Sequence, residues 1–328
     1  MNRLILITAL VAVFSSAVYA EVTFEGDIAL GASYNSNLAL ISPDDRSTTG
    51  MRTSDIASFS LDLDAFLTLI PADVFALEYT LFTAVPPHPA TVDYAFFNHS
   101  LAALFSHEFE EVDISYGVEL GHLLIGFNNR LLDPQILFDL FWYAHDNLSY
   151  YLTVAGSYVV SLDEEYAYLT APGFRFENGI YIYPVAGNRS FISLGVGERM
   201  FFFGEDDFET PDLISVTARR DSAETYLRLK GKYFYEGFSA EASLRYGFTQ
   251  YMGADEWIEG GDALYSKVRV DHTLRTKATL EYRFTDLFSM QAYYSYLRAF
   301  SNIGDEPADY ENDDFDQHAA GLMFRFVF

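Results

Sequence analysis

The stretch Ala320-Gly321-Leu322-Met323-Phe324-Arg325-Phe326-Val327-Phe328 carries large apolar side chains at every second position and finishes on an aromatic ring. Successive side chains of a β-strand point to opposite faces, so this alternation predicts a strand with one apolar face and one mixed face. Similar segments recur along most of the chain. The sequence therefore predicts a fold built from half-apolar strands.

Alternation of this kind is found in about fourteen segments. In the second of them, Phe59, Leu61 and Leu63 fall on one face, while Asp62 and Asp64 fall on the other. The fourth and sixth segments alternate weakly, so their phase stays open, and twelve or sixteen strands remain alternatives. The expected strands span 22–34, 56–70, 75–84, 93–105, 112–123, 135–144, 148–160, 174–183, 190–203, 223–234, 238–251, 264–284, 287–300 and 317–328.

The connections between these segments alternate between short and long. Short turns on one side and long loops on the other, with an even strand number and both termini on the short side, are typical of an up-and-down antiparallel barrel. The short connections are expected at 71–73, 106–110, 145–147, 184–189, 235–237 and 285–286, and the long ones at 35–55, 85–92, 125–134, 161–173, 204–222, 252–263 and 301–316.

Residues 1–20 have the features of a cleavable signal peptide. Arg3 supplies a positive charge, 4–14 form an apolar core too short to span a bilayer, and Val18-Tyr19-Ala20 suits the cleavage site. The mature chain is expected to start near Glu21 and to form a single domain over 21–328. It contains no cysteine, which excludes a disulfide framework and thiolate metal sites.

Together, the export signal, the alternating segments and the final Phe328 resemble a bacterial outer-membrane β-barrel protein. The resemblance covers the mature chain. It implies an all-β, transmembrane, antiparallel up-and-down barrel of about fourteen strands in the outer membrane of a Gram-negative bacterium. It also implies contact with outer-membrane lipid, and insertion by the barrel-assembly machinery through the C-terminal strand that ends at Phe328. Tyr34-Asn35-Ser36-Asn37 is similar to a sequence at the outer end of the first strand in various such barrels.

Aromatic side chains gather at the expected strand ends, where amphipathic rings suit the membrane interface. The alternative fold is a soluble β-sandwich, but its interior would protect far fewer apolar faces than this chain offers. The aromatic residues expected near the periplasmic rim are Phe24, Phe75, Trp142, Tyr150, Phe238, Tyr282, Phe284, Phe288, Phe326 and Phe328.

The formal net charge is −27, and the charges are unevenly distributed. Basic residues are scarce in the first half of the chain and frequent in the second. Because strands follow one another around a barrel, an acidic wall is expected to face a basic wall. The acidic residues expected to face the lumen are Glu25, Asp27, Asp62, Asp64, Glu78, Asp113, Glu119 and Asp139. The basic residues expected there are Arg175, Arg199, Arg228, Lys230, Lys232, Arg245, Lys267, Arg269, Arg275, Lys277, Arg283 and Arg325.

The resemblance implies a porin-like outer-membrane channel for passive diffusion of small polar or charged solutes, with the two charged walls lining its pore. The opposed charges could equally brace the lumen, as interior side chains do in small barrels. At the seam between the first and last strands, Arg325 is expected to approach Glu25 or Asp27. The solute and the oligomeric state stay open.

A second hypothesis is a transporter of hydrophobic compounds, because the strand count resembles that of the fourteen-strand outer-membrane fatty-acid transporters. The first expected strand starts directly after the signal peptide, so no N-terminal hatch of the kind those transporters have is expected. A structural barrel or an outer-membrane enzyme is the third hypothesis. Aromatic residues expected in the lumen are Phe66, Phe82, Phe96, Phe141, Tyr143, Tyr151, Phe201, Phe203, Tyr226 and Tyr293.

No catalytic, metal-binding or cofactor-binding pattern is recognisable in the sequence. His99 and Ser100 are adjacent, so a strand would point them to opposite faces. The histidines lack metal-ligand spacing, and His88, His107 and His145 fall in expected connections. Phosphate-loop, dinucleotide and Gly-x-Ser-x-Gly motifs are also lacking. We therefore expect no enzyme activity, no metal and no cofactor. The acidic loops argue against a nucleic-acid partner.

Overall fold

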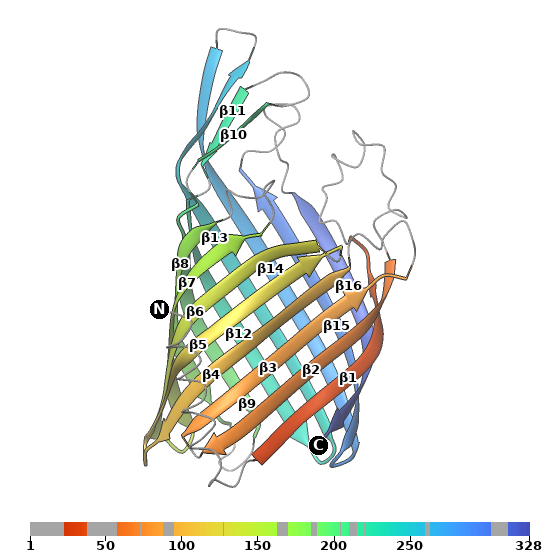
Figure 1. The fold of residues 1–328 in the computed structure, drawn as a ribbon. Coiled ribbons are helices and arrows are strands. Elements are labelled where there is room, and N and C mark those ends of the chain that lie inside the picture. Colours follow the sequence, from red (N-terminus) through yellow and green to blue (C-terminus); the bar gives the residue numbers. More distant parts are fainter. Residues whose placement is uncertain are drawn as a thin grey trace, which may run out of the picture.

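The computed structural model describes one closed antiparallel barrel of 14 strands (Figure 1). No helix in the described part of the chain is long and apolar enough to cross a bilayer. The signal peptide expected at 1–20 lies outside the described residues. The structure describes residues 23–37, 58–72, 74–87, 95–126, 128–162, 170–184, 189–203, 205–209, 215–219, 221–259, 263–302 and 314–328, with backbone alone at 58, 71–72, 205–209, 215–219, 255–259 and 263–267.

Each of the fourteen segments expected from the alternation forms a barrel strand. The barrel strands are β1 (Thr23–Asn35), β2 (Ser58–Ala72), β3 (Phe75–Val85), β4 (Phe96–Glu108), β5 (Val112–Ile125), β6 (Asn128–His145), β7 (Leu148–Ser161), β8 (Ala171–Ile182), β9 (Phe191–Phe201), β12 (Ser222–Tyr235), β13 (Phe238–Glu259), β14 (Ala263–Thr285), β15 (Phe288–Ser301) and β16 (Phe315–Val327). We call the end with the tight connections 145–148, 235–238 and 285–288 the turn end, and the opposite end the loop end.

The first and last strands close the barrel. β1 pairs with β16, with Ala29 opposite Arg325 and Gly31 opposite Met323. Reciprocal hydrogen bonds of 3.0 Å between the backbones of Gly26 and Phe328 complete the seam at the turn end. Closure matters because an unpaired backbone group in lipid costs several kcal/mol.

Side chains alternate between the outside and the interior along each barrel strand. Phe59 and Leu61 on β2 are 68% and 61% exposed on the outside, whereas the intervening Ser60 and Asp62 are 3% and 5% exposed. The same alternation places Leu227 and Leu229 on the outside of β12, with Arg228 between them facing inward. The exterior is therefore an apolar belt, and the charged side chains of β2 and β12 face the lumen.

The expected aromatic girdle is confirmed at the turn end. Phe24 and Phe328 lie 5.7 Å apart between ring centroids, and Trp142 and Tyr150 lie 5.5 Å apart. Further ring contacts join outward residues within β14 (Tyr282–Phe284) and between neighbouring strands (Phe284–Phe288 and Phe288–Phe326). The rings belong to outward-facing residues, where they suit a membrane interface.

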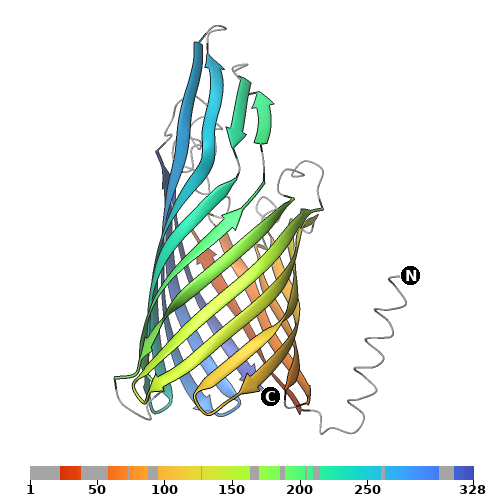
Figure 2. The same ribbon diagram turned by 90° about the vertical axis from the view of Figure 1, so that its left-hand side faces the viewer.

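Two expected long loops are wrong. The connection expected at 125–134 is short, because β5 runs to Ile125 and β6 already starts at Asn128. The connection expected at 252–263 is mostly strand, because β13 continues to Glu259 and β14 begins at Ala263 (Figure 2). The two strands pair with each other beyond the barrel, and this pairing satisfies the backbone groups along their facing edges.

Two short strands lie within the connection expected at 204–222. They are β10 (Glu205–Glu209) and β11 (Ser215–Arg219), which pair with each other. β11 also pairs with the extension of β13. His107, expected in a connection, instead lies within β4, with its ring 5.8 Å from that of Tyr116. The strand is longer at this end because the ladder continues to the pair between Glu108 and Asp113.

Candidate functional site

The barrel interior encloses a cavity of about 870 Å³. Asp62 and Asp64 of β2 line one side of it, and Arg275 and Lys277 of β14 line another. Polar and apolar groups from most of the remaining wall complete the lining, including Arg228, Arg245, Phe82, Phe96, Ile125 and Tyr293. The cavity therefore brings together residues from both expected walls.

Apart from Asp27, the carboxylates expected on the acidic wall form no ion pair among the described residues. Tyr293 donates a hydrogen bond of 3.5 Å to Oδ2 of Asp62, while Oδ1 of Asp62 and Oδ1 of Asp64 are buried without a partner in the described structure. Asp139 accepts a 2.6 Å hydrogen bond from the Thr153 hydroxyl, and Asp113 accepts one from Tyr143. Within the described residues, Glu25, Glu78 and Glu119 form no ion pair either. This wall keeps most of its negative charge.

The basic wall contains acidic residues of its own, which the sequence analysis missed. Glu177, Glu224 and Glu241 fall on the inward face and neutralise neighbouring cations. The sequence did indicate the inward position of Glu177, because this residue lies two positions after Arg175 on β8 and therefore faces the same side. The ion pairs are Arg228–Glu177 at 2.5 Å, Arg245–Glu224 at 2.7 Å, Lys230–Glu241 at 3.0 Å and Lys232–Glu241 at 3.8 Å.

Glu177 is the centre of a buried polar network on the basic wall. Both of its carboxylate oxygens accept hydrogen bonds, one from Tyr151 at 2.8 Å and the other from Tyr226 at 2.7 Å. Arg228 completes the network through Glu177 and through the Tyr151 hydroxyl at 3.2 Å. The strand between these residues, β9, carries no side chain at Gly195 or Gly197, and a Cβ atom at either would collide with one of the tyrosines. The glycines therefore permit the network.

Several cations of the basic wall have no carboxylate partner among the described residues. Arg275 lies directly opposite Arg245 in the register between β13 and β14, and Arg175 lies directly opposite Arg199 between β8 and β9. Like charges at directly opposite positions are destabilising in a sheet. Lys277 contacts the face of Tyr293, with Nζ 5.4 Å from the ring centroid. These groups are available to an anion in the lumen.

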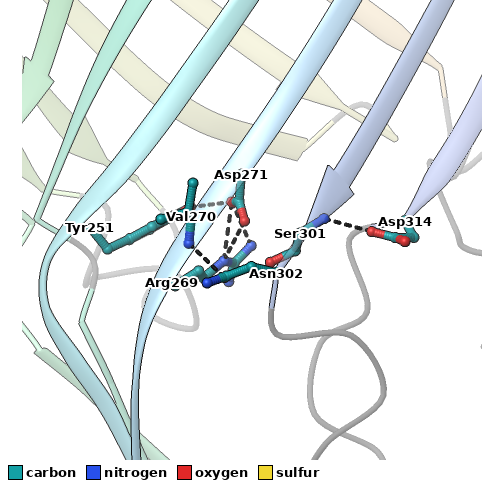
Figure 3. A network of polar contacts seen from close by, with 7 residues as sticks. All are labelled: Tyr251, Arg269, Val270, Asp271, Ser301, Asn302 and Asp314. Atoms are coloured by element: carbon teal, nitrogen blue, oxygen red, sulfur yellow. Dashed lines mark hydrogen bonds and ion pairs between the residues drawn. The ribbon is translucent and has the colours of Figure 1, made fainter.

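Arg269, expected to line the pore, belongs to a polar network at the loop end (Figure 3). Its side chain forms hydrogen bonds of 3.0 and 3.1 Å to both carboxylate oxygens of Asp271 and lies 4.7 Å from the ring centroid of Tyr251. Tyr251 donates a further hydrogen bond of 3.0 Å to Asp271. The side chain of Lys267, also expected in the pore, lies outside the described residues.

The same view shows two contacts that fix the end of β15 (Figure 3). Val270 donates a backbone hydrogen bond of 2.8 Å to the side chain of Asn302, and Ser301 donates one of 2.6 Å to Asp314. These contacts hold both ends of the connection between β15 and β16 at the rim of the barrel.

The ion pair expected at the seam is confirmed. Nε of Arg325 lies 3.3 Å from Oδ1 of Asp27. In the register Arg325 is opposite Ala29, so it reaches Asp27 diagonally. Arg283, by contrast, makes no ion pair within the described residues.

A second, smaller cavity of about 390 Å³ lies against β5 to β8. Aromatic rings gather beside it towards the turn end, with Tyr181 5.5 Å from Phe141 and 5.1 Å from Phe191 between centroids. Phe141 was expected in the lumen, whereas Tyr181 was missed although it has the same inward phase as Glu177. The interior thus also offers an aromatic surface.

His99 and Ser100 point to opposite faces. Nε2 of His99 lies 2.8 Å from Nδ1 of His122, and His99 belongs to the outward-facing set of β4. Ser100 instead hydrogen-bonds to Thr80 at 2.8 Å. The two residues therefore cannot form a direct nucleophile and base pair.

These features define a class of protein. The barrel is closed and antiparallel, its exterior is apolar with an aromatic girdle, and its interior is polar and charged, which is the architecture of outer-membrane β-barrels. The chain has the fold of this class.

No protein-family model and no curated protein sequence matches the chain. Solved structures with a similar fold include OmpT, an outer membrane protein of Vibrio cholerae, which is 9% identical, with 94% of this chain and 97% of that chain covered and a TM-score of 0.44. An outer membrane channel from Pseudomonas putida F1 is 11% identical, covering 94% and 98%, with a TM-score of 0.43. An anion-selective porin from Comamonas acidovorans is 8% identical, covering 94% and 99%, with a TM-score of 0.44. Likeness at this level supports no argument about function.

Proposed function

We propose that the protein is a channel for the passive diffusion of small polar or charged solutes across the bacterial outer membrane. The observation that carries the proposal is the cavity of about 870 Å³, whose lining includes both unpartnered carboxylates and unpartnered cations. A lumen built only for bracing would be expected to pair these charges with one another. Side-chain charges that line a watery passage set its ion selectivity.

The charges would produce a field across the lumen. Negative charge is concentrated at Asp62 and Asp64, and positive charge at Arg275 and Lys277. Interactions between such groups are weakened beyond about 10 Å at 0.1 M salt, so the field acts mainly on solutes inside the cavity. A passing solute would therefore experience both signs of charge at the same level of the pore.

Planar bilayer recording tests the proposal. The full-length mature chain, reconstituted from detergent, is expected to give steady single-channel conductance in KCl. A refolded protein that inserts into the bilayer but stays electrically silent would contradict the channel and leave a plugged transporter, an enzyme or a structural barrel.

Uptake of apolar molecules is the second candidate function. The cluster of Phe141, Tyr181 and Phe191 in the lumen favours it, because a continuous aromatic surface could guide an apolar solute. Vesicles carrying the protein would then accumulate a fluorescent fatty acid faster than protein-free vesicles. Equal rates would exclude this function.

We infer that the loop end faces the cell exterior and the turn end faces the periplasm, as is usual for barrels with short turns on one side. Protease added to intact cells is expected to cut within 204–222 or 301–316. Cleavage only after the outer membrane has been breached would reverse this orientation. The barrel-assembly machinery is the expected partner for insertion, through β16 and the final Phe328.

A further inference from the structure

Two pairs of opposite charges face the large cavity from strands on either side of the seam. Asp62 and Asp64 are two residues apart on β2, and Arg275 and Lys277 are two residues apart on β14. In the sheet, β1, β16 and β15 separate the two strands. All four side chains line the cavity, and no ion pair joins the two pairs in the described structure.

Tyr293 of β15 stands between the two pairs. Its ring centroid is 5.4 Å from Nζ of Lys277, and its hydroxyl is 3.5 Å from Oδ2 of Asp62. The neighbouring positions on β16 and β1 carry short side chains, such as Gly321 and Ser33. One tyrosine side chain therefore separates the positive from the negative charges. Lys277 contacts the ring of this tyrosine and Asp62 contacts its hydroxyl, and the two charged groups form no ion pair in the described structure.

Both pairs would gain from a ligand. Asp62 is only 5% exposed, yet its Oδ1 has no hydrogen-bond partner among the described residues. Such a buried unsatisfied acceptor is costly. Arg275 lies directly opposite Arg245, so like charges adjoin there. An ammonium group beside the aspartates and a carboxylate beside Arg275 and Lys277 would each place an opposite charge next to one of the two pairs.

The cavity also has an apolar side and a suitable size. Phe82, Phe96 and Ile125 line it across the lumen from β14. Its volume of about 870 Å³ falls within the range of roughly 300–1,000 Å³ found for small-molecule sites. An extended dipeptide spans about 7 Å between its ends, so its two charged ends can contact groups that lie at the ring and at the hydroxyl of one tyrosine.

We propose that this cavity binds short zwitterionic peptides, above all dipeptides. The peptide ammonium group contacts Asp62 and Asp64, its carboxylate contacts Arg275 and Lys277, and an apolar side chain packs against Phe82 or Phe96. The inference rests on the proposed channel function, because the peptide reaches the cavity through the lumen, and it names the solute class of that channel.

Isothermal titration calorimetry on the detergent-purified full chain tests the site with four probes. They are glycyl-phenylalanine, its N-acetyl derivative, its C-terminal amide and free phenylalanine. Partly wet charge pairs contribute modestly, so the unmodified dipeptide is expected to bind about fivefold more tightly than each of the other three. Equal affinity for the dipeptide and both capped forms would overturn the proposal.

Two double variants test which end of the peptide each pair of charged residues contacts. Asp62→Asn with Asp64→Asn should remove the advantage over the N-acetyl form, and Arg275→Gln with Lys277→Gln should remove the advantage over the amide. The control, Arg298→Gln with Asp316→Asn, neutralises one cation and one carboxylate that face outward on β15 and β16, and it should preserve both advantages. Loss of both in the control would overturn the assignment. Because the probe series uses the unmodified protein, it decides the proposal even if a variant fails to fold.

Conductance of the same preparation separates the two proposals. Steady conductance without a preference for the zwitterion retains the channel and overturns the peptide site. Charge-specific dipeptide binding by an electrically silent protein retains the site and overturns passive conduction.

Discussion

The two walls of the barrel interior hold their charges in different ways. On β12 and β13, Arg228 and Arg245 each have a glutamate partner within 2.7 Å. On β2, Asp62 and Asp64 have no cationic partner, and one oxygen of each is buried without a hydrogen bond. The basic wall is therefore partly neutralised by its own acids, whereas on the acidic wall only Asp27 has a cationic partner among the described residues. The sequence, in which basic residues are frequent in the second half, therefore suggests more free positive charge in the lumen than the structure leaves unpaired.

The difference implies different roles for charges that look equivalent in the sequence. Paired groups such as Glu177 and Arg228 connect β8 with β12 across β9 and hold two tyrosine hydroxyls in place. Groups without partners, such as Asp64 and Arg275, contribute little to packing and are available to solutes. Substitutions of paired residues on the basic wall should therefore lower the stability of the barrel, whereas substitutions of residues without partners should change its ion selectivity.

The largest effect is expected at Glu177. Glu177→Ala leaves Arg228 and two tyrosine hydroxyls without their acceptor, and breaking a buried pair in this way should cost about 3 kcal/mol of unfolding free energy. Urea unfolding in lipid vesicles, followed by tryptophan fluorescence, measures it. Asp64→Asn on the acidic wall is the control and should change stability by less than about 0.5 kcal/mol. Similar losses in both variants would remove the distinction between the walls.

The second largest loss of stability is expected at the β9 glycines that contact the tyrosine side chains. A Cβ atom at Gly197 would collide with Tyr226, so Gly197→Ala should cost about 1–3 kcal/mol by overpacking. At Gly156 a Cβ atom would meet nothing within 4 Å. Gly156→Ala is therefore the matched control, and the same urea titration should place it within about 0.5 kcal/mol of the parent protein. A harmless Gly197→Ala would show that Tyr226 can move without loss.

Selectivity should move in opposite directions at the two unpartnered pairs. Arg275→Gln with Lys277→Gln should shift the permeability ratio towards cations, and Asp62→Asn with Asp64→Asn towards anions, each by about two- to fivefold. Reversal potentials in a KCl gradient measure the shifts, which should shrink as salt increases because ions screen the charges. Arg298→Gln on the outward face is the control. Shifts of the same sign in both double variants would contradict a field across the lumen.

The smallest effect is expected at the seam. Asp27→Asn removes the partner of Arg325, but the pair is partly wet, so the expected cost is about 0–1 kcal/mol. Glu25→Gln, which breaks no ion pair in the described structure, is the comparison in the same urea titration. A loss well above 1 kcal/mol at Asp27 would mean that this pair also fixes the strand register.

The sequence predicted the strands well because their signal is local. Period-two alternation located all fourteen barrel strands and the inward phase of residues such as Asp62 and Arg228. It failed near the loop end, because shifts in register interrupt the alternation there, between Gln250 and Ala254 in the β13–β14 pairing and at Leu123 and Leu124 in the β5–β6 pairing. For the same reason the short connection after Ile125 was expected to be a long loop.

The candidate site was only partly predictable. Inward charges could be named from their phase, but their partners depend on the register of strands that can be far apart in the sequence. Arg228 and Glu177 lie on strands separated by β9, whose glycines permit the contact. Arg269 has the same phase as Arg275, but it is held by Asp271, which removes it from the expected set of free charges.

The sequence by itself determined the apolar exterior and the charged interior, because both follow from alternation within a strand, and it predicted about fourteen strands, a number that the closed barrel then fixed. Only the tertiary structure decided which charges are neutralised and which remain free. Closure between β1 and β16 brings β2 and β14, more than two hundred residues apart in the sequence, to one cavity. Their opposite charges can act on a single solute because the barrel closes, and no local pattern encodes that distance.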